Sequence, residues 1–380
     1  MSETNIIGPE PLRAQYYESL VEMLDAVFRA DSKQSMREDF PYYLRPDNFP
    51  NLCICRDRDR VVSHVGFLPV KLSCFGSLLR VGMIGAVATD EDYRGKGLAT
   101  RTLQFALQRF KDAGGVFLMI SGGRGLYQRI GARSVGTFHQ FCLAPSEQKK
   151  NDLSVDKIGP DQARILSELQ QQKPYRFIRP LEEWQMRMGK NRCQGHISAF
   201  WLVRNNQKPS AYFVLPENPG SDDDICPLRE WGGKSEDVIA GLSRVADTRG
   251  CKGVRWRLYP HETRARAALM AAGAEFEGAV QTQGSIRIVN FVRLISSLSD
   301  YFAEKIGQIT TDALRANSSG ETFKLELADE KLEINGWGNL AECLFSEDAP
   351  AIAALDAGPL KNVLNELLPL PCPQYNFSYT

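Results

Sequence analysis

The chain has 380 residues, 43% of them hydrophobic and 24% charged, which is typical of a globular protein with two or three domains. Its 46 basic and 46 acidic residues balance, so the positive excess that favours nucleic-acid binding is missing. No segment approaches the run of about 18 apolar residues that spans a membrane, and the N-terminal region does not have the pattern of a secretion signal. We therefore expect a cytoplasmic protein that binds neither nucleic acid nor membrane.

The cysteines and histidines give no indication of a metal or redox site. The nine cysteines are scattered, without a CxxC pair or the spacing of zinc ligands. Cys53 and Cys55 would point to the same side of a strand, where we expect them to be small core residues. The four histidines are dispersed as well. We predict no metal.

The first region of the chain has the order α, β, β, β, α, β. Apolar residues at spacings of three and four predict a helix from Tyr16 to Phe28. Three strands follow as an antiparallel meander, and a second helical stripe then leads to a short buried strand. The strands are expected at Leu52–Arg56, Val61–Leu72, Leu79–Ala88 and Val116–Ile120, and the second stripe consists of Leu98, Leu103, Ala106, Leu107 and Phe110.

Two further regions follow a polar segment at 144–160 that we interpret as a linker. The second region repeats the order of the first, which suggests a repeated architecture. The predicted domains are 1–145, 155–285 and 286–380, in a mixed α+β fold. The expected elements are strands at Ile197–Arg204, Ser210–Leu215, Leu228–Gly232, Gly253–Tyr259, Thr322–Leu327 and Lys331–Ile334, and helices at Val238–Thr248, Val292–Ile306 and Ala351–Leu368.

The most informative segment is Arg94-Gly95-Lys96-Gly97-Leu98-Ala99, between the third strand and the second helix. Backbone N–H groups converge there at the positive end of a helix, where glycines allow an anion to approach closely. The GxxxxGK[ST] spacing of triphosphate sites is absent, and a dinucleotide GxGxxG would need a third glycine at Thr100. The alternative is a tight turn that binds no ligand.

This segment resembles the R/Q-x-x-G-x-G/A signature of the GNAT acetyltransferase superfamily. The resemblance implies that the loop and helix bind the pyrophosphate of acetyl-CoA, which would be a co-substrate. It also implies a bulge in the preceding strand that faces the pantetheine arm and thioester, and a next strand that splays away to admit them. The implied contacts with acetyl-CoA are Val87, Ala88, Thr89, Arg94, Gly95, Lys96, Gly97, Leu98, Ala99, Thr100, Ser121 and Gly122.

A tyrosine, Tyr127, follows the splayed strand. A phenol with a pKa near ~10 holds its proton at neutral pH and can give it to the thiolate that leaves when an amine attacks a thioester. The superfamily's Y-x-x-x-G-F/A pattern places its acid here, which favours catalysis over simple packing of the ring on the sheet. Backbone N–H groups of the bulged strand would hold the oxyanion.

The whole chain resembles the Eis-type N-acetyltransferases, which combine two GNAT units with a third domain similar to sterol carrier protein. Residues 229–238 lack the pyrophosphate spacing, so we expect one acetyl-CoA site per chain. In Eis-type enzymes the terminal carboxylate is the general base, which the resemblance assigns to Thr380; a frayed tail is the alternative. The resemblance also implies a homo-oligomer such as a hexamer.

The sequence does not identify the acceptor amine. Asp25, Phe28, Glu38 and Tyr42 lie in the region that usually lines the GNAT acceptor pocket, although solvated surface charge is the simpler explanation for the acidic residues. Amine-bearing small molecules and protein lysines both stay open as acceptors. Two other functions also stay open, namely fatty-acyl or aminoacyl transfer by the same fold and non-catalytic binding of acyl-CoA or lipid.

Overall fold

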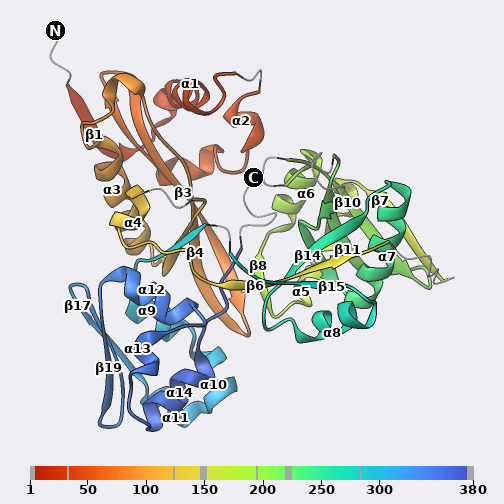
Figure 1. The fold of residues 1–380 in the computed structure, drawn as a ribbon. Coiled ribbons are helices and arrows are strands. Elements are labelled where there is room, and N and C mark those ends of the chain that lie inside the picture. Colours follow the sequence, from red (N-terminus) through yellow and green to blue (C-terminus); the bar gives the residue numbers. More distant parts are fainter. Residues whose placement is uncertain are drawn as a thin grey trace. The chain divides into compact units, whose positions relative to one another are not determined.

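The computed structural model describes residues 5–31, 34–122, 125–145, 152–193, 196–218, 225–282 and 284–374. Its internal contacts divide the chain into two compact units. The first unit consists of residues 1–135 and 283–370, and the second of residues 136–282 and 371–380. Figure 1 labels most of the helices and many of the strands of both units.

The main sheet of the first unit has the strand order β1-β2-β3-β4-β5-β16. All neighbouring strands are antiparallel except β4 and β5, which are parallel. The predicted meander is confirmed as β2, β3 and β4, whereas β1 and β16 were not predicted. The strands are β1 Ile6–Pro11, β2 Leu52–Asp57, β3 Arg60–Cys74, β4 Ser77–Thr89, β5 Phe117–Ile120 and β16 Ser285–Ile288.

Helices cover both faces of this sheet (Figure 1). α1 (Tyr17–Phe28) packs on β3 and β4, and α3 (Leu98–Asp112) packs on the other face, against β2, β3 and β4. The buried side of α3 contains the predicted stripe except Leu107, which is partly buried, and Thr102 in addition. The Phe110 ring lies 5.2 Å from that of Phe67 on β3. Two short helices, α2 Met36–Asp39 and α4 Gly125–Arg129, follow α1 and β5 along the chain.

The rest of the first unit is an antiparallel sheet, β17-β18-β19, with helices around it. Both predicted strands are confirmed as β18 and β19. The helix predicted at Ala351–Leu368 is instead two helices, because Gly358 is extended and Pro359 begins a new helix at its first position. The elements are β17 Arg315–Ser319, β18 Thr322–Leu327, β19 Glu330–Asn335, α9 Phe291–Ser297, α10 Ser299–Ile306, α11 Gln308–Ala313, α12 Trp337–Phe345, α13 Pro350–Ala353 and α14 Pro359–Leu367.

The second unit has two sheets, β13-β11-β10-β7 and β12-β14-β6-β15. The linker interpretation is wrong for Leu153–Ile158, because this segment is strand β7 and pairs with β10. β6 lies within the predicted domain 1–145 but pairs with β14 and β15 of the second unit. The elements are β6 Thr137–Leu143, β7 Leu153–Ile158, α5 Ala163–Gln171, β8 Tyr175–Ile178, α6 Leu181–Gly189, β9 Arg192–Cys193, β10 His196–Asn205, β11 Lys208–Pro216, β12 Ile225–Pro227, β13 Glu230–Gly233, α7 Ser235–Thr248, β14 Gly253–Leu258, α8 Thr263–Ala271 and β15 Glu275–Gln281.

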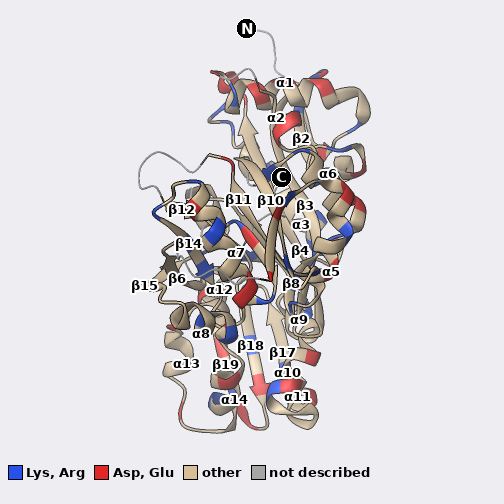
Figure 2. Cartoon of the chain, turned by 90° about the vertical axis from the view of Figure 1, so that its right-hand side faces the viewer, with Lys and Arg blue, Asp and Glu red and all other residues tan. Residues whose placement is uncertain are grey.

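Charged residues are interspersed along the helices and strands, as Figure 2 shows, in keeping with the zero formal net charge. Among the described residues, no helix is long and apolar enough to cross a membrane. The same residues contain no group of three His, Cys, Asp or Glu side chains that could hold a metal ion. Cys53 and Cys55 are buried, and burial raises the pKa of the Cys53 thiol to about 12, so they are core residues.

Candidate active site

After β4 the chain forms a short 3-10 turn at Glu91–Tyr93. The glycine loop, residues 94–97, follows this turn and leads into α3. Gly95 and Gly97 have φ angles of +77° and +72°, a left-handed conformation that favours glycine. No atom lies within 4 Å of the position that a Cβ would take at either glycine, so the loop is open to a ligand. Both Arg94 and Lys96 are exposed beside it.

The first turn of α3 has no acidic residue to compensate the positive end of the helix. Gly97 is the N-cap of this helix and provides no side-chain hydrogen bond. The first N–H groups of a helix have no partner within the helix, and they carry the positive end of its dipole. This end of α3, with Leu98, Ala99 and Thr100 in its first turn, is therefore suited to an anion such as pyrophosphate.

The strands β4 and β5 diverge at the point that the resemblance implies. They pair in parallel from Val81 with Phe117 to Ile84 with Ile120. Beyond that pair β4 continues to Thr89, and β5 ends before Ser121 and Gly122. The Gly122 carbonyl oxygen accepts a hydrogen bond from the Ser285 hydroxyl of β16 at 3.2 Å.

A bulge interrupts β4 in the part that no longer pairs with β5. Gly85 pairs with Gly66 and Ala88 pairs with His64, so Ala86 and Val87 both lie opposite the single residue Val65. Ala86 has a φ of +49°, which is unusual for a residue with a side chain. The resemblance implied this feature at Val87, Ala88 and Thr89, so the bulge begins one residue earlier than expected.

Tyr127 lies on α4, just after the diverging strand. Its side chain is buried in the same hydrophobic cluster as Ile84 and Ile120, the last paired residues of β4 and β5. Val87 packs against that cluster from the bulge. The structure thus brings the predicted acid close to the strand ends, although the catalytic role of its hydroxyl stays a prediction.

The residues predicted to line an acceptor pocket have different environments. The Asp25 carboxylate accepts hydrogen bonds from the Ser35 hydroxyl and the Met36 N–H, each at 2.7 Å, and so connects α1 to the start of α2. Tyr42 is buried beneath an arginine side chain, Glu38 is exposed and Phe28 is half-buried. Their part in acceptor binding stays a prediction. Thr380 lies outside the described residues.

Sequence reasoning did not indicate that two side chains contact the bulge. His64 Nδ1 lies 2.7 Å from the Ala86 carbonyl oxygen, and the Tyr43 hydroxyl donates to the Gly85 carbonyl oxygen at 2.8 Å. Both side chains are buried. No spacing in the sequence indicates either contact, because each depends on the register of β3 against β4.

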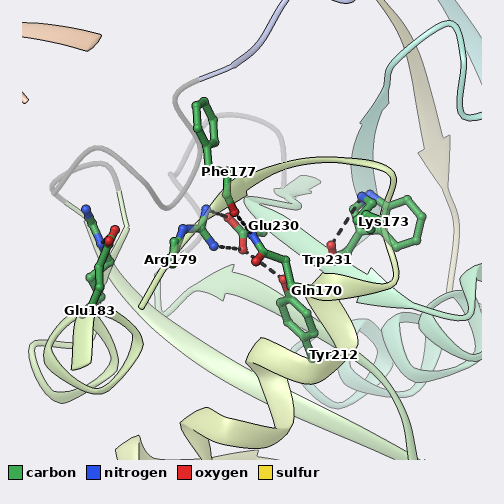
Figure 3. Close-up of polar contacts among 9 residues, drawn as sticks. Gln170, Lys173, Phe177, Arg179, Glu183, Tyr212, Glu230 and Trp231 are labelled. Atoms are coloured by element: carbon green, nitrogen blue, oxygen red, sulfur yellow. Dashed lines mark hydrogen bonds and ion pairs between the residues drawn. The ribbon is translucent and has the colours of Figure 1, made fainter. Parts of the chain in front are cut away.

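The second unit has a similar order of elements, but its strands form two separate sheets. β12 pairs in parallel with the start of β14, and β13 then continues along β11. Where the first unit opens, the rings of Trp231 on β13 and Trp256 on β14 lie 5.0 Å apart. The Lys173 ammonium lies 3.6 Å from the centroid of the Trp231 ring (Figure 3). The indole rings therefore occupy the space between these two strands.

A buried ion pair lies beside these rings (Figure 3). Arg179 donates two hydrogen bonds to the Glu230 carboxylate, at 2.6 and 2.8 Å, and the Tyr212 hydroxyl donates a third at 3.0 Å. Although burial alone would lower the pKa of Arg179, the Glu230 carboxylate outweighs that effect and the pKa is raised. The guanidinium, carboxylate and hydroxyl groups here form hydrogen bonds with one another, as buried polar groups in a structural core do.

Comparisons with known proteins agree with this geometry. The family model for the acetyltransferase (GNAT) domain matches residues 9–135. The chain is 29% identical over 127 residues to an uncharacterized N-acetyltransferase, YhbS, of Escherichia coli K12, an alignment that covers 33% of this chain and 75% of the relative. The residues matched by the family model include the glycine loop, the bulge and Tyr127.

Solved structures share the fold over nearly the whole chain. A GCN5-related N-acetyltransferase from Anabaena variabilis superimposes with a TM-score of 0.65 and 16% identity, covering 96% of this chain and 97% of the other. Eis1 from Mycobacterium abscessus gives a TM-score of 0.59 and 10% identity, covering 96% of each chain. These structures show a common fold, and the match at residues 9–135 identifies that part of the chain as an acetyltransferase (GNAT) domain.

Proposed function

We propose that the protein uses acetyl-CoA to acetylate a primary amine by direct attack, at a single site in the first unit. The observation that supports this most strongly is the N-terminus of α3. It has two left-handed glycines, open space around them, no acidic residue in its first turn and no side-chain cap. Those properties suit the pyrophosphate of coenzyme A.

The reaction needs three positioned groups besides the cofactor loop: an oxyanion site, an acid and a base. The amine nitrogen attacks the thioester carbonyl carbon, and backbone N–H groups at the bulge stabilise the oxyanion that forms. As the C–S bond breaks, Tyr127 gives its phenolic proton to the departing thiolate. The amine loses its proton to a base, for which the terminal carboxylate of Thr380 stays our prediction.

The acyl group and the acceptor are less constrained. Acetyl transfer is the simplest assignment for a GNAT domain, and a fatty-acyl or aminoacyl donor would use the same loop with a longer pocket. We propose an amine-bearing small molecule or a protein lysine as acceptor. The third segment, with its β17-β18-β19 sheet, is proposed as the part that resembles sterol carrier protein, and the assembly as a homo-oligomer.

The substitution Tyr127→Phe tests the catalytic part of this proposal. Phenylalanine keeps the buried ring and removes only the proton donor, so kcat is expected to fall about 100-fold while the Kd for acetyl-CoA stays within twofold. The acceptor is first found by mass spectrometry of an amine panel incubated with enzyme and acetyl-CoA. Steady-state kinetics and calorimetry then measure the two constants.

The outcomes separate the candidate functions. A normal kcat in Tyr127→Phe would remove this residue from the mechanism. A wild-type chain that binds acetyl-CoA but acetylates no amine in the panel would favour the non-catalytic binding protein. Faster turnover with long-chain acyl-CoA than with acetyl-CoA would favour the fatty-acyl transferase.

A further inference from the structure

The bulge in β4 is a backbone conformation that needs support. Ala86 has a φ of +49°, and a left-handed conformation costs a residue with a Cβ roughly 1–2 kcal/mol. Such conformations persist where surrounding contacts define them, and they are concentrated at functional sites. The contacts around Ala86 therefore show how the first unit maintains this part of the candidate site.

His64 contacts the bulge from the neighbouring strand, β3. A carbonyl oxygen can only accept a hydrogen bond, so the 2.7 Å contact with the Ala86 oxygen places the proton on His64 Nδ1. Nε2 is then an unprotonated nitrogen, and it is buried without a hydrogen-bond partner. Burial lowers the pKa of His64 to about 4, with the bond to Ala86 opposing that effect, so the ring is neutral at physiological pH.

Tyr43 contacts the adjacent peptide from a loop. Its hydroxyl donates to the Gly85 carbonyl oxygen at 2.8 Å. The loop is itself fixed, because the Asn48 side-chain amide donates to the Tyr43 carbonyl oxygen at 2.8 Å and to that of Phe67 on β3 at 3.3 Å. The hydroxyl therefore comes from a backbone that is attached to the sheet.

Gly66 provides the space for both side chains. A Cβ at Gly66 would lie 2.3 Å from the Tyr43 hydroxyl oxygen and 2.9 Å from His64 Nε2. Distances below 3.0 Å are essentially never found for a real Cβ, so a larger residue would displace one of the two donors. The strand β3 thus provides one donor and leaves room for the other.

Two consecutive carbonyl groups are held in this way, and each belongs to a planar peptide. In a trans peptide the N–H of the next residue points opposite to the carbonyl. Fixing the carbonyls of Gly85 and Ala86 therefore fixes the directions of the N–H groups of Ala86 and Val87. These are backbone donors in the part of β4 that has left β5.

We propose that His64 and Tyr43 are positioning residues that hold the bulge of β4 in the orientation required to stabilise the oxyanion. This proposal rests on the acetyl-transfer function above and extends it to two side chains that touch neither acetyl-CoA nor amine. They act through the peptides of Gly85 and Ala86. Because the glycine loop that would hold the pyrophosphate is a separate element, we expect them to affect turnover much more than cofactor affinity.

Three variants test the proposal. Tyr43→Phe removes one hydroxyl and is expected to lower kcat about tenfold with KM for acetyl-CoA within twofold, because small displacements of catalytic groups have large effects on rate. His64→Leu removes the other donor and has a similar effect. His64→Asn keeps an N–H near the position of Nδ1, so it restores at least half of the wild-type kcat, which a role in packing alone would not predict.

A second readout follows the bulge directly. Hydrogen–deuterium exchange of a peptide covering residues 85–89 is expected to rise in Tyr43→Phe and His64→Leu and to return to the wild-type level in His64→Asn. The matched control is Ser77→Ala, which removes a buried hydrogen bond from the opposite end of β4, where the Ser77 hydroxyl oxygen accepts from the Tyr301 N–H at 3.0 Å. This control lowers the melting temperature and leaves kcat and exchange at 85–89 unchanged.

The results distinguish this proposal from the function on which it rests. If wild-type enzyme acetylates an amine and Tyr43→Phe has normal kcat and normal exchange, the proposal is overturned. If His64→Leu does not fold, the single-atom change in Tyr43→Phe still decides. If the wild type transfers no acetyl group, the proposed function fails, while exchange at 85–89 still shows whether the two side chains hold the bulge.

Discussion

Two helices occupy the same place in the two units, and their N-termini differ in charge. α3 follows the glycine loop and has no acidic residue in its first turn. α7 follows β13 and has Glu236 and Asp237 there. A hydrogen bond from its own backbone N–H lowers the pKa of Glu236, and Asp237 is buried with the Asn205 amide 3.1 Å away. The second helix thus neutralises its own N-terminus, whereas the first leaves it for a ligand.

The glycines of the two turns differ in the same way. Gly95 and Gly97 are surrounded by open space, so glycine is needed there for its backbone conformation and for close approach. Gly233, just before α7, also has a positive φ, of +84°, but a Cβ there would lie 2.2 Å from the carbonyl oxygen of Ser210. One turn is open to a ligand and the other is packed against its own sheet.

Two units with a similar order of elements therefore need not have the same binding site. The second unit also has a helix after its antiparallel strands, but its strands form two sheets, tryptophan rings fill the gap between β13 and β14, and carboxylates compensate its helix end. Its polar groups are expected to support folding, and those of the first unit are expected to support binding and catalysis. Three sets of substitutions test that division.

The largest expected effect is on the buried ion pair of the second unit. Glu230→Gln removes the carboxylate that faces the Arg179 guanidinium, and breaking a buried pair in this way destabilises a protein by about 3–5 kcal/mol. Denaturant unfolding measures the change, and Glu217→Gln at the more exposed pair with Lys157 is the control, at less than about 1 kcal/mol. Acetyl-CoA affinity, measured where both variants are folded, is expected to stay within twofold.

The next effect comes from giving α3 the charges of α7. Ala99→Glu with Thr100→Asp places carboxylates at the corresponding first-turn positions, where they would repel pyrophosphate and raise the Kd for acetyl-CoA at least 100-fold, about 2.8 kcal/mol. The neutral control is Ala99→Gln with Thr100→Asn. Because acidic residues stabilise a helix N-terminus, the melting temperature is not expected to fall. Equal affinities of the charged and neutral variants would contradict the placement of the anion at this helix.

The smallest effect separates the two kinds of glycine. Gly95→Ala introduces a left-handed alanine without a clash, which costs roughly 1–2 kcal/mol. We expect about a fivefold rise in the Kd for acetyl-CoA. Gly233→Ala introduces a clash with the backbone, so it lowers the free energy of unfolding and leaves the Kd unchanged. Calorimetry measures the Kd and thermal unfolding measures the stability of both variants. An unchanged Kd in Gly95→Ala together with a raised Kd in Gly233→Ala would contradict the prediction.

The regular elements could be predicted where one side of the chain is buried. The apolar stripe of α3 and the alternation in β18 specify their period and their buried face, and both elements formed as expected. The strand β7 has the polar sequence of a linker, because only its two end residues are buried. An edge strand with so little burial has almost no hydrophobic pattern to detect.

The candidate site could be predicted only in part. The glycine loop is local in sequence, so the spacing of its residues is enough to indicate an anion site. The bulge at Ala86 and its contacts with His64 and Tyr43 depend on a register shift between two strands, and neither the alanine nor the histidine has a spacing that indicates it. Features produced by long-range pairing are not visible in local patterns.

The most direct test of the comparison is a calorimetric titration of the wild-type chain with acetyl-CoA. An open N-terminus at α3 and a neutralised one at α7 predict a single site per chain, lost in the variant with Ala99→Glu and Thr100→Asp. Two sites per chain would contradict the account of the second unit. A single site that survives the two added carboxylates would contradict the central claim that α3 holds the pyrophosphate.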